Sequence, residues 1–255
     1  MSDRADATDE GATDDSGASR EISTTGSGTP GVAGRTVLIA GATSASGRAA
    51  TLALTAAGAV VVATGRDAEK LSPLEALGAR TETVDLTSER EVHALADRLH
   101  DDGVRIDGLL DLVGGWRGGG GLAGQTEADY RALEHSFTAL RHVSRAFDGD
   151  LRASTAGRLV IVSSTAVARP LAGGANYAAV KAASEAWTRA VAQGYARAAR
   201  DAGEPLRAAA VIIRVTALAG LEERLAATVA GLWDADAPTL NDTTLDNTTL
   251  DLGAS

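Results

Sequence analysis

The segment from Arg35 to Asp67 constrains the fold more than any other part of this chain. Its sequence, RTVLIAGATSASGRAATLALTAAGAVVVATGRD, joins an apolar run, a turn of small residues, an alanine-rich stretch and a second apolar run. Short β-branched runs favour strands, and the alanine-rich stretch between them favours a helix. The segment therefore predicts a β-α-β unit, which is the building block of parallel sheets.

The turn inside this unit has the composition of a phosphate-binding turn. Small residues keep its backbone thin, so a diphosphate can rest on the N-terminus of the following helix, where unpaired N–H groups and the helix dipole favour anions. An ordinary tight turn between a strand and a helix is the alternative. From this turn we predict five cofactor contacts: Gly41, Thr43, Ala45, Ser46 and Gly47.

Arg66 follows the second predicted strand, at a position where an acidic residue would bind the ribose of NAD. An arginine suits the 2′-phosphate of NADP instead, because its guanidinium forms paired hydrogen bonds with phosphate. The sequence therefore predicts NADP(H) as the cofactor. Asp67 lies next to Arg66 and keeps NAD(H) open as the alternative.

Ser164, Tyr177 and Lys181 form the second informative pattern. Only two of the 24 basic residues are lysines, Lys70 and Lys181, so an amine at position 181 is unusual in this chain. The segment 173–200 is rich in alanine and free of proline, which predicts a helix with Tyr177 and Lys181 on one face. An ammonium there stabilises a phenolate, so Tyr177 gains as a proton donor. A surface lysine near a half-buried tyrosine is the plainer interpretation.

The run GRLVIVSSTA at residues 157–166 predicts a buried strand that ends at Ser163 and Ser164. Ligands bind at the carboxyl ends of parallel strands, so a serine there can hydrogen-bond a substrate oxygen. The two serines point in different directions, and the distance in sequence to Tyr177 favours Ser164.

Together these residues resemble the short-chain dehydrogenase/reductase family, from about Arg35 to the end of the chain. Residues 40–47 (AGATSASG) are similar to the family's TGxxxGxG turn, and Ser164, Tyr177 and Lys181 match its catalytic residues one for one. The resemblance implies that Asp85 and Leu86 contact adenine. It also implies that Gly114, in the segment LDLVG, lies where the family's NNAG motif contacts the cofactor, and that Tyr177 and Lys181 contact the cofactor as well.

The chain departs from the family pattern in two places. Family members usually carry a catalytic asparagine on the helix expected at 128–147, yet that segment contains none, and Ser136 or Phe137 falls near the position. After the strand expected at 206–215, a long substrate-covering segment is usual, whereas here a helix is expected almost at once, at 221–233. The residues 113–119 (VGGWRGG) are similar to a loop of the quinoid dihydropteridine reductase branch, which is also short. Trp116 in this loop is a candidate wall for a flat or apolar substrate; a packed tryptophan beside a flexible glycine run is the alternative.

Composition argues against several other kinds of site and partner. The chain has no cysteine, and its four histidines show no spacing typical of a metal site, so we expect neither a disulfide nor a bound metal. No apolar run approaches the ~18 residues of a membrane span. The net charge of −10 belongs to the two ends of the chain, since the residues between 35 and 233 hold equal numbers of acids and bases. No basic stripe indicates nucleic acid as a partner.

The first 33 residues are acidic and poor in apolar side chains, which predicts a disordered tail without a signal peptide or transit peptide. Residues 34–251 are then the reductase domain. Near the end of the chain TTLD occurs twice, at 243–246 and 248–251, and one copy is expected to supply the last strand.

The sequence thus predicts one doubly wound α/β domain with a parallel sheet of about seven strands. The expected function is reduction of a carbonyl, or oxidation of an alcohol, on a small organic substrate, in the cytoplasm and by hydride transfer with Ser164, Tyr177 and Lys181. The alternative is a protein that binds NADP(H) without turnover, as a regulator or partner subunit. The family resemblance also implies a homo-oligomer formed through the helices at 128–147 and 173–200.

Overall fold

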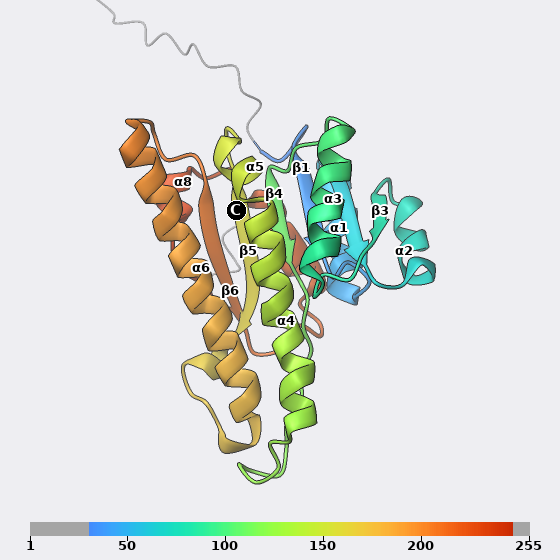
Figure 1. Ribbon diagram of the computed structural model, residues 1–255, viewed down its shortest axis with the longest axis vertical. Helices are drawn as coiled ribbons and strands as arrows, with labels where there is room; N and C mark the ends of the chain where they lie inside the picture. Colours follow the sequence, from blue (N-terminus) through green and yellow to red (C-terminus); the bar gives the residue numbers. More distant parts are fainter. Residues whose placement is uncertain (1–30, 247–255) are drawn as a thin grey trace, which may run out of the picture.

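The computed structural model describes residues 31–246 and shows one parallel sheet between two layers of helices (Figure 1). Its seven strands lie in the order β3-β2-β1-β4-β5-β6-β7, and every neighbouring pair is parallel. This confirms the predicted doubly wound fold. The strands are β1 (Thr36–Ala40), β2 (Val60–Gly65), β3 (Arg80–Thr83), β4 (Gly108–Asp111), β5 (Arg158–Ser164), β6 (Ala209–Val215) and β7 (Thr243–Leu245).

Alternate residues of each strand enter two separate cores, because successive side chains of a strand point to opposite faces of a sheet. Val37 and Ile39 of β1 pack in the first core, and Leu38 and Ala40 pack in the second. The first core is covered by α1 (Ala45–Ala56), α2 (Ala68–Glu75), α7 (Glu222–Gly231) and α8 (Ala237–Leu240). The second is covered by α3 (Glu89–Asp101), α4 (Glu127–Ala146), α5 (Asp148–Ala153) and α6 (Ala175–Ala202).

Side-chain caps set where several helices begin. Ser44 accepts a hydrogen bond from the Gly47 amide at the start of α1, and Thr126 accepts one from the Asp129 amide at the start of α4. At its other end α6 stops at Gly203, which adopts a left-handed conformation that glycine reaches without strain. The predicted helices at 128–147 and 173–200 therefore form within two residues of their expected bounds.

The last strand confirms the expectation from the TTLD repeat, since β7 is formed by the first copy. The second copy lies outside the described residues, as does the predicted acidic tail up to residue 30. Val32, which was assigned to that tail, is buried in the first core. None of the helices described here is both long and apolar enough to cross a membrane.

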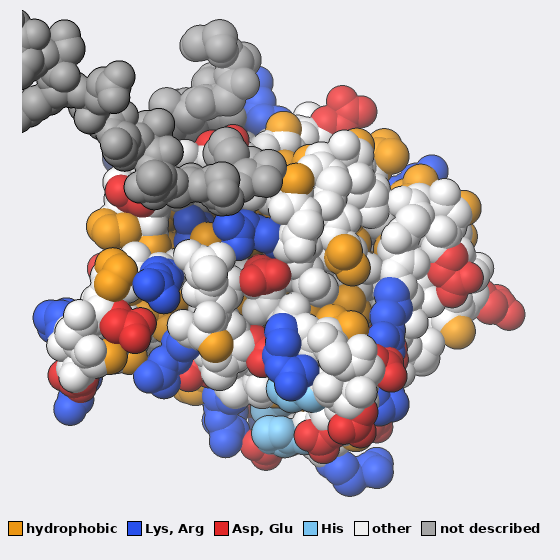
Figure 2. Space-filling view, turned by 90° about the horizontal axis from the view of Figure 1, so that it is seen from above, with side chains coloured by type: hydrophobic (Ala, Val, Ile, Leu, Met, Phe, Trp, Pro, Cys, Tyr) orange, Lys and Arg blue, Asp and Glu red, His pale blue; other side chains and the backbone are white. Residues whose placement is uncertain are grey.

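The sheet has its topological switch point between β1 and β4, where the strand order reverses. The strands run downward in Figure 1, so their carboxyl ends and the loops after β4 and β5 lie at the lower end of the molecule. The opposite end, seen in Figure 2, carries acidic and basic side chains interspersed with one another. A ligand crevice is expected at the lower end, where the switch point opens.

Candidate active site

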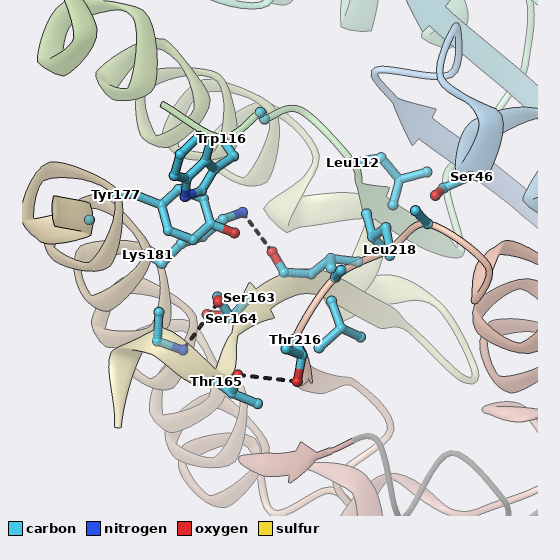
Figure 3. A pocket seen from close by; sticks show the side chains of 18 of the residues that line it. Ser46, Leu112, Trp116, Ser163, Ser164, Thr165, Tyr177, Lys181, Thr216 and Leu218 are labelled. Atoms are coloured by element: carbon cyan, nitrogen blue, oxygen red, sulfur yellow. Dashed lines mark hydrogen bonds between the residues drawn. The ribbon is translucent and has the colours of Figure 1, made fainter. Parts of the chain in front are cut away.

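A cavity of about 1070 Å³ opens at the carboxyl ends of β1, β4, β5 and β6 (Figure 3). Its wall includes the N-terminal residues of α1, the loops after β4 and β5, the first turns of α6 and the connection after β6. Six predicted site residues line it: Ala45, Ser46, Gly114, Ser164, Tyr177 and Lys181. The fold therefore brings the predicted phosphate-binding turn and the predicted catalytic residues to one space.

The predicted phosphate-binding turn is shaped by two glycines. Gly41 has a positive φ of 79°, and a Cβ there would approach the Val113 backbone. A Cβ on Gly47 would collide with the carbonyl of Ala42, so the chain can enter α1 this tightly only with glycine. Thr43 packs its methyl group beside Gly65 at the end of β2. Gly41, Thr43 and Gly47 thus set the backbone of the turn, while Ser44, Ala45 and Ser46 face the cavity.

The predicted adenosine contacts lie outside the lining of this cavity, beyond the end of β2. Arg66 is exposed, and its charge contributes to lowering the pKa of Asp85, after hydrogen bonds from Thr87. Asp67 caps α2 by accepting from the amides of Glu69 and Lys70 and pairs with the Lys70 ammonium at 3.2 Å. The Asp67 carboxylate is therefore already engaged as a helix cap, whereas the Arg66 side chain is not engaged in this way.

Leu86 can take part in the predicted cofactor contact only through its backbone. Its side chain is buried in the second core, between α3 and α4, and its carbonyl lies 3.2 Å from Nδ1 of His142. Only its backbone can face a nucleotide. Asp85 has one carboxylate oxygen bonded to the Thr87 amide and hydroxyl, at 2.9 and 2.7 Å.

Ser163 and Ser164 separate as predicted. The Ser163 hydroxyl donates to Oε1 of Glu185 at 2.7 Å, which commits it to a buried ion-pair cluster. The Ser164 oxygen accepts from the Ala166 amide at 3.2 Å, so its own hydrogen stays available for a ligand (Figure 3). Of the two, Ser164 is the one that can donate a hydrogen bond into the cavity.

Tyr177 and Lys181 lie one turn apart on α6. The Lys181 ammonium donates to the carbonyl of Val162 at 2.8 Å and lies 6.0 Å from the centre of the Tyr177 ring (Figure 3). Burial lowers the pKa of Lys181, and the carboxyl groups of Asp111 and Glu185 act in the opposite direction. The amine is therefore fixed in position beside the tyrosine.

Glu185 lies one further turn along α6 and is fully buried. Its carboxylate accepts from Ser163, from Arg189 and, through two nitrogens, from Arg214. Burial acts to raise the pKa of Glu185, but the hydrogen bonds from Arg214, Ser163 and Arg189 hold it below its usual value. This cluster ties α6 to the ends of β5 and β6 beneath the cavity.

Asp111 is a buried acid in the cavity wall for which we predicted no role from the sequence. It ends β4, the residue is 7% exposed, and one carboxylate oxygen accepts from the Val113 amide at 3.1 Å. Burial raises the pKa of Asp111 to about 7, although the Lys181 ammonium and the Val113 amide lower it. An acid inside the apolar run GLLDLV is the signal that could have identified it.

Neither candidate for the missing asparagine reaches the cavity wall. Ser136 is buried on α4, and its hydroxyl donates to the Leu133 carbonyl of its own helix at 2.7 Å. Phe137 packs edge-on against Trp187 of α6, with ring centres 6.2 Å apart.

The glycine-rich loop after β4 is held in place rather than free. The Gly119 amide donates to the Gly173 carbonyl at 2.7 Å, and Nε2 of Gln125 donates to the same carbonyl at 2.9 Å. Oε1 of Gln125 accepts from the Asn176 amide at the start of α6. Trp116, which lines the cavity, is thus carried on a loop fastened to the helix of Tyr177. Gln125 had no distinguishing signal in the sequence.

The connection after β6 confirms the second departure from the family pattern. It runs over Thr216–Leu221 and enters α7 at Glu222, so no long segment intervenes. Thr216 and Leu218 line the cavity from this side (Figure 3). Among the described residues, no group of three or more histidines and carboxylates is arranged to hold a metal ion.

Comparison with known proteins agrees with this architecture. A short-chain-type dehydrogenase/reductase from Mycobacterium ulcerans superposes with a TM-score of 0.73 at 20% identity, over 85% of this chain and 89% of its own. A short chain dehydrogenase from Shigella flexneri 2a strain 301, whose structure is complexed with NADP, gives a TM-score of 0.72 at 22% identity, over 84% and 97%. At these identities the likeness shows the fold.

Matches found by sequence bear on the family of the chain as well as on its fold. The protein DnrU of Streptomyces sp. (strain C5), which is named for daunorubicin C-13 ketoreduction, is 45% identical over 97 residues. That match spans 34% of this chain and 34% of the relative, so it covers about a third of each protein. The family model for short chain dehydrogenases matches residues 35–199, which hold both the phosphate-binding turn and Ser164, Tyr177 and Lys181. The chain belongs to the short chain dehydrogenase family.

Proposed function

We propose that this protein is an NADPH-dependent reductase of a carbonyl group on a small organic substrate, with alcohol oxidation as the reverse reaction. The observation that carries the proposal is the single cavity that joins the N-terminus of α1 to Ser164, Tyr177 and Lys181. Hydride transfer requires the cofactor and the proton donor to meet at one substrate carbonyl, and this cavity has room for both.

The residues present fit a dinucleotide. The turn before α1 offers backbone amides at a helix N-terminus and the hydroxyls of Ser44 and Ser46, which suit a diphosphate. Gly114 and Lys181 would hold the nicotinamide end, and Arg66 would hold a 2′-phosphate. When bound, the cofactor supplies the hydride.

The protein supplies the proton and the orientation. In the proposed reaction Tyr177 donates its phenolic proton to the substrate oxygen, which becomes a hydroxyl. Ser164 holds the same oxygen through the hydrogen that its contact with Ala166 leaves available. Lys181 stabilises the phenolate that remains, because its positive charge is fixed beside the ring.

The cavity wall favours an apolar substrate with an aromatic body. Trp116 and Leu171 are largely exposed at the cavity, at 64% and 77%, and Leu112, Val113 and Leu218 continue the apolar surface. Exposed apolar side chains that gather around a cavity are typical of ligand sites. The partial relative named for ketone reduction on daunorubicin makes polycyclic aromatic ketones the first compounds to test.

The test is the variant Tyr177→Phe, assayed by NADPH oxidation over aldehydes, ketones, quinones, pteridines and polycyclic ketones. Turnover should fall by about 10² or more, because the proposed proton donor is lost while the ring is kept. NADPH affinity, measured by fluorescence, should change little. Tyr130→Phe is the matched control, since Tyr130 lies on α4 beside Arg131 and outside the cavity lining.

A protein that binds NADP(H) without turnover is the second candidate, favoured by the absence of an asparagine at positions 136 and 137. Tight NADPH binding by the wild type with no oxidation over the whole panel would support it. Near-normal turnover by Tyr177→Phe on an identified substrate would instead refute the role given to Tyr177.

A further inference from the structure

Each reduction removes one proton from Tyr177, so the site needs a group that can return it. Lys181 is the cation fixed beside Tyr177 and can pass a proton to it. Lys181 then needs a nearby titratable group from which it regains that proton. Ser136 is committed to the Leu133 carbonyl and lies outside the cavity lining. The buried acid that shares the cavity wall with Lys181 is Asp111.

The sheet register places Asp111 next to the anchor of the lysine. Asp111 of β4 pairs with Ile161 of β5, and the next residue, Val162, provides the carbonyl that binds the Lys181 ammonium at 2.8 Å. Three residues after Asp111, a Cβ on Gly114 would lie 3.5 Å from the same nitrogen. The end of β4 and the end of β5 therefore enclose the amine from two sides.

One oxygen of Asp111 is free to exchange a proton. The Val113 amide occupies Oδ1 at 3.1 Å, and no side chain or backbone group of residues 31–246 donates to Oδ2. Asn at this position would offer a fixed amide, whereas a carboxyl group can hold or release a proton. Asp111 thus has an ionisable group and an oxygen atom that is available to exchange a proton.

Burial shifts the pKa values of the two groups toward each other, against the effect of the surrounding charges. Around the pair, α6 contributes Tyr177, Lys181 and Glu185, β5 contributes Ser163, and β6 contributes Arg214, which is neutralised by Glu185. Burial raises the pKa of Asp111 to about 7 and lowers that of Lys181. The two pKa values therefore lie closer together than in free side chains, which favours proton exchange between acid and amine.

We propose that Asp111 is the proton-holding residue of this site and acts through Lys181, in place of the asparagine that family members usually carry on the helix at α4. The proposal rests on the function proposed above. A Lys181 N–H first breaks as the O–H of Tyr177 is restored, which leaves a neutral amine. The carboxyl O–H of Asp111 then breaks as an N–H bond forms on Lys181, with solvent in the cavity carrying the proton between the two groups. Asp111 becomes a carboxylate and regains its proton from solvent in the cavity, so one proton is consumed per carbonyl reduced and no electron moves on this path.

The two-lysine composition allows a direct test without a substrate. Protein labelled with ¹³C at lysine Cε gives one signal for Lys181 and one for Lys70, which is exposed on α2 and identified by Lys70→Arg. In the wild type, the Lys181 signal should show an additional titration step near pH 7 as Asp111 ionises, and the Lys70 signal should not. In Asp111→Asn that step should vanish and the pKa of Lys181 should fall, because a neighbouring carboxylate is gone.

Asp102→Asn is the control, since Asp102 is exposed and pairs with Arg80, away from the cavity. It should leave both lysine signals unchanged. The wild-type titration is decisive even if Asp111→Asn does not fold: a Lys181 signal without a step between pH 6 and 8 overturns the proposal.

Kinetics separate this proposal from the function on which it rests. Asp111→Asn should lower kcat for carbonyl reduction about tenfold and remove the ionisation near pH 7 from the pH profile, with KM almost unchanged. An unaltered pH profile in Asp111→Asn, with Tyr177→Phe inactive, overturns the role of Asp111 alone. Full activity in Tyr177→Phe overturns the proposed function itself.

Discussion

At the scale of single residues, the proposed preference for NADP over NAD rests on the two side chains that follow β2. The structure gives Asp67 the role of helix cap for α2, with its carboxylate turned to the amides of Glu69 and Lys70. Arg66 stays exposed on the side of Asp85. This arrangement supports the proposed preference for NADPH, because the acid that could bind a ribose is already engaged.

The prediction at this scale is that Arg66→Ala weakens NADPH binding by roughly 10- to 150-fold, the value of about 1.5 to 3 kcal/mol for a charge-assisted contact. NADH affinity should stay the same, since NAD carries a neutral hydroxyl there. Fluorescence titration of both cofactors measures this, with Arg90→Ala as the control, because Arg90 is an exposed residue of α3. Wild-type protein that binds NADH as tightly as NADPH would refute the assignment.

Residues whose partners are near in sequence were predictable, and residues whose partners are distant were not. The spacing of Tyr177 and Lys181 places them on one helix face by geometry alone. The contact of Gln125 with Gly173 joins positions far apart in the chain, and no sequence pattern predicts it. Leu86 stays a predicted cofactor contact, and the burial of its side chain in the second core depends on packing that a short motif does not encode.

At the scale of elements, α6 and the glycine-rich loop act as one unit. Gln125 joins them by donating to the carbonyls of Gly119 and Gly173 and by accepting from the Asn176 amide. The helix bounds followed from composition, whereas the loop was expected to be either flexible or a cover over substrate. Its hydrogen bonds to Gly173 are long-range contacts that only the folded chain reveals.

The prediction for this unit is that Gln125→Ala frees the loop that carries Trp116. Loss of these hydrogen bonds should cost about 1 to 3 kcal/mol locally. Amide exchange in residues 115–125 should accelerate, and KM for an apolar ketone should rise several-fold. Gln193→Ala, on the exposed side of α6, is the matched control. Unchanged exchange in the loop would show that glycine geometry alone holds it.

At the scale of the whole molecule, two cores flank one sheet, and the first includes a residue that precedes β1. Val32 is 3% exposed and packs with residues of β1, β2 and α7 in that core. The β-α-β pattern and the buried run of β5 predicted part of the sheet. The family resemblance implied the rest, including a last strand from the TTLD repeat. Burial of Val32 was not predicted, because a lone valine in a glycine-rich segment shows no periodicity.

The prediction for the whole chain separates the acidic tail from Val32. We propose that deletion of residues 1–30 leaves the melting temperature and NADPH affinity almost unchanged, as expected for a segment without a core-forming pattern. Val32→Ala in the full chain should instead lower the free energy of unfolding by about 2 kcal/mol, because two buried carbons are removed. Urea denaturation measures both. A loss of several degrees on deletion would mean that the acidic segment stabilises the domain.

The short connection between β6 and α7 has a consequence for how the cavity works. Thr216–Leu221 lines one side of the cavity and is too short to fold across it. Substrate and product can then exchange on that side by diffusion, without the opening and closing steps that limit many enzymes. Water enters by the same side, so rate enhancement has to come from fixed orientation of groups rather than from sequestration. In the proposed reaction, the same accessible water is the reservoir that returns a proton to Asp111 after each turnover.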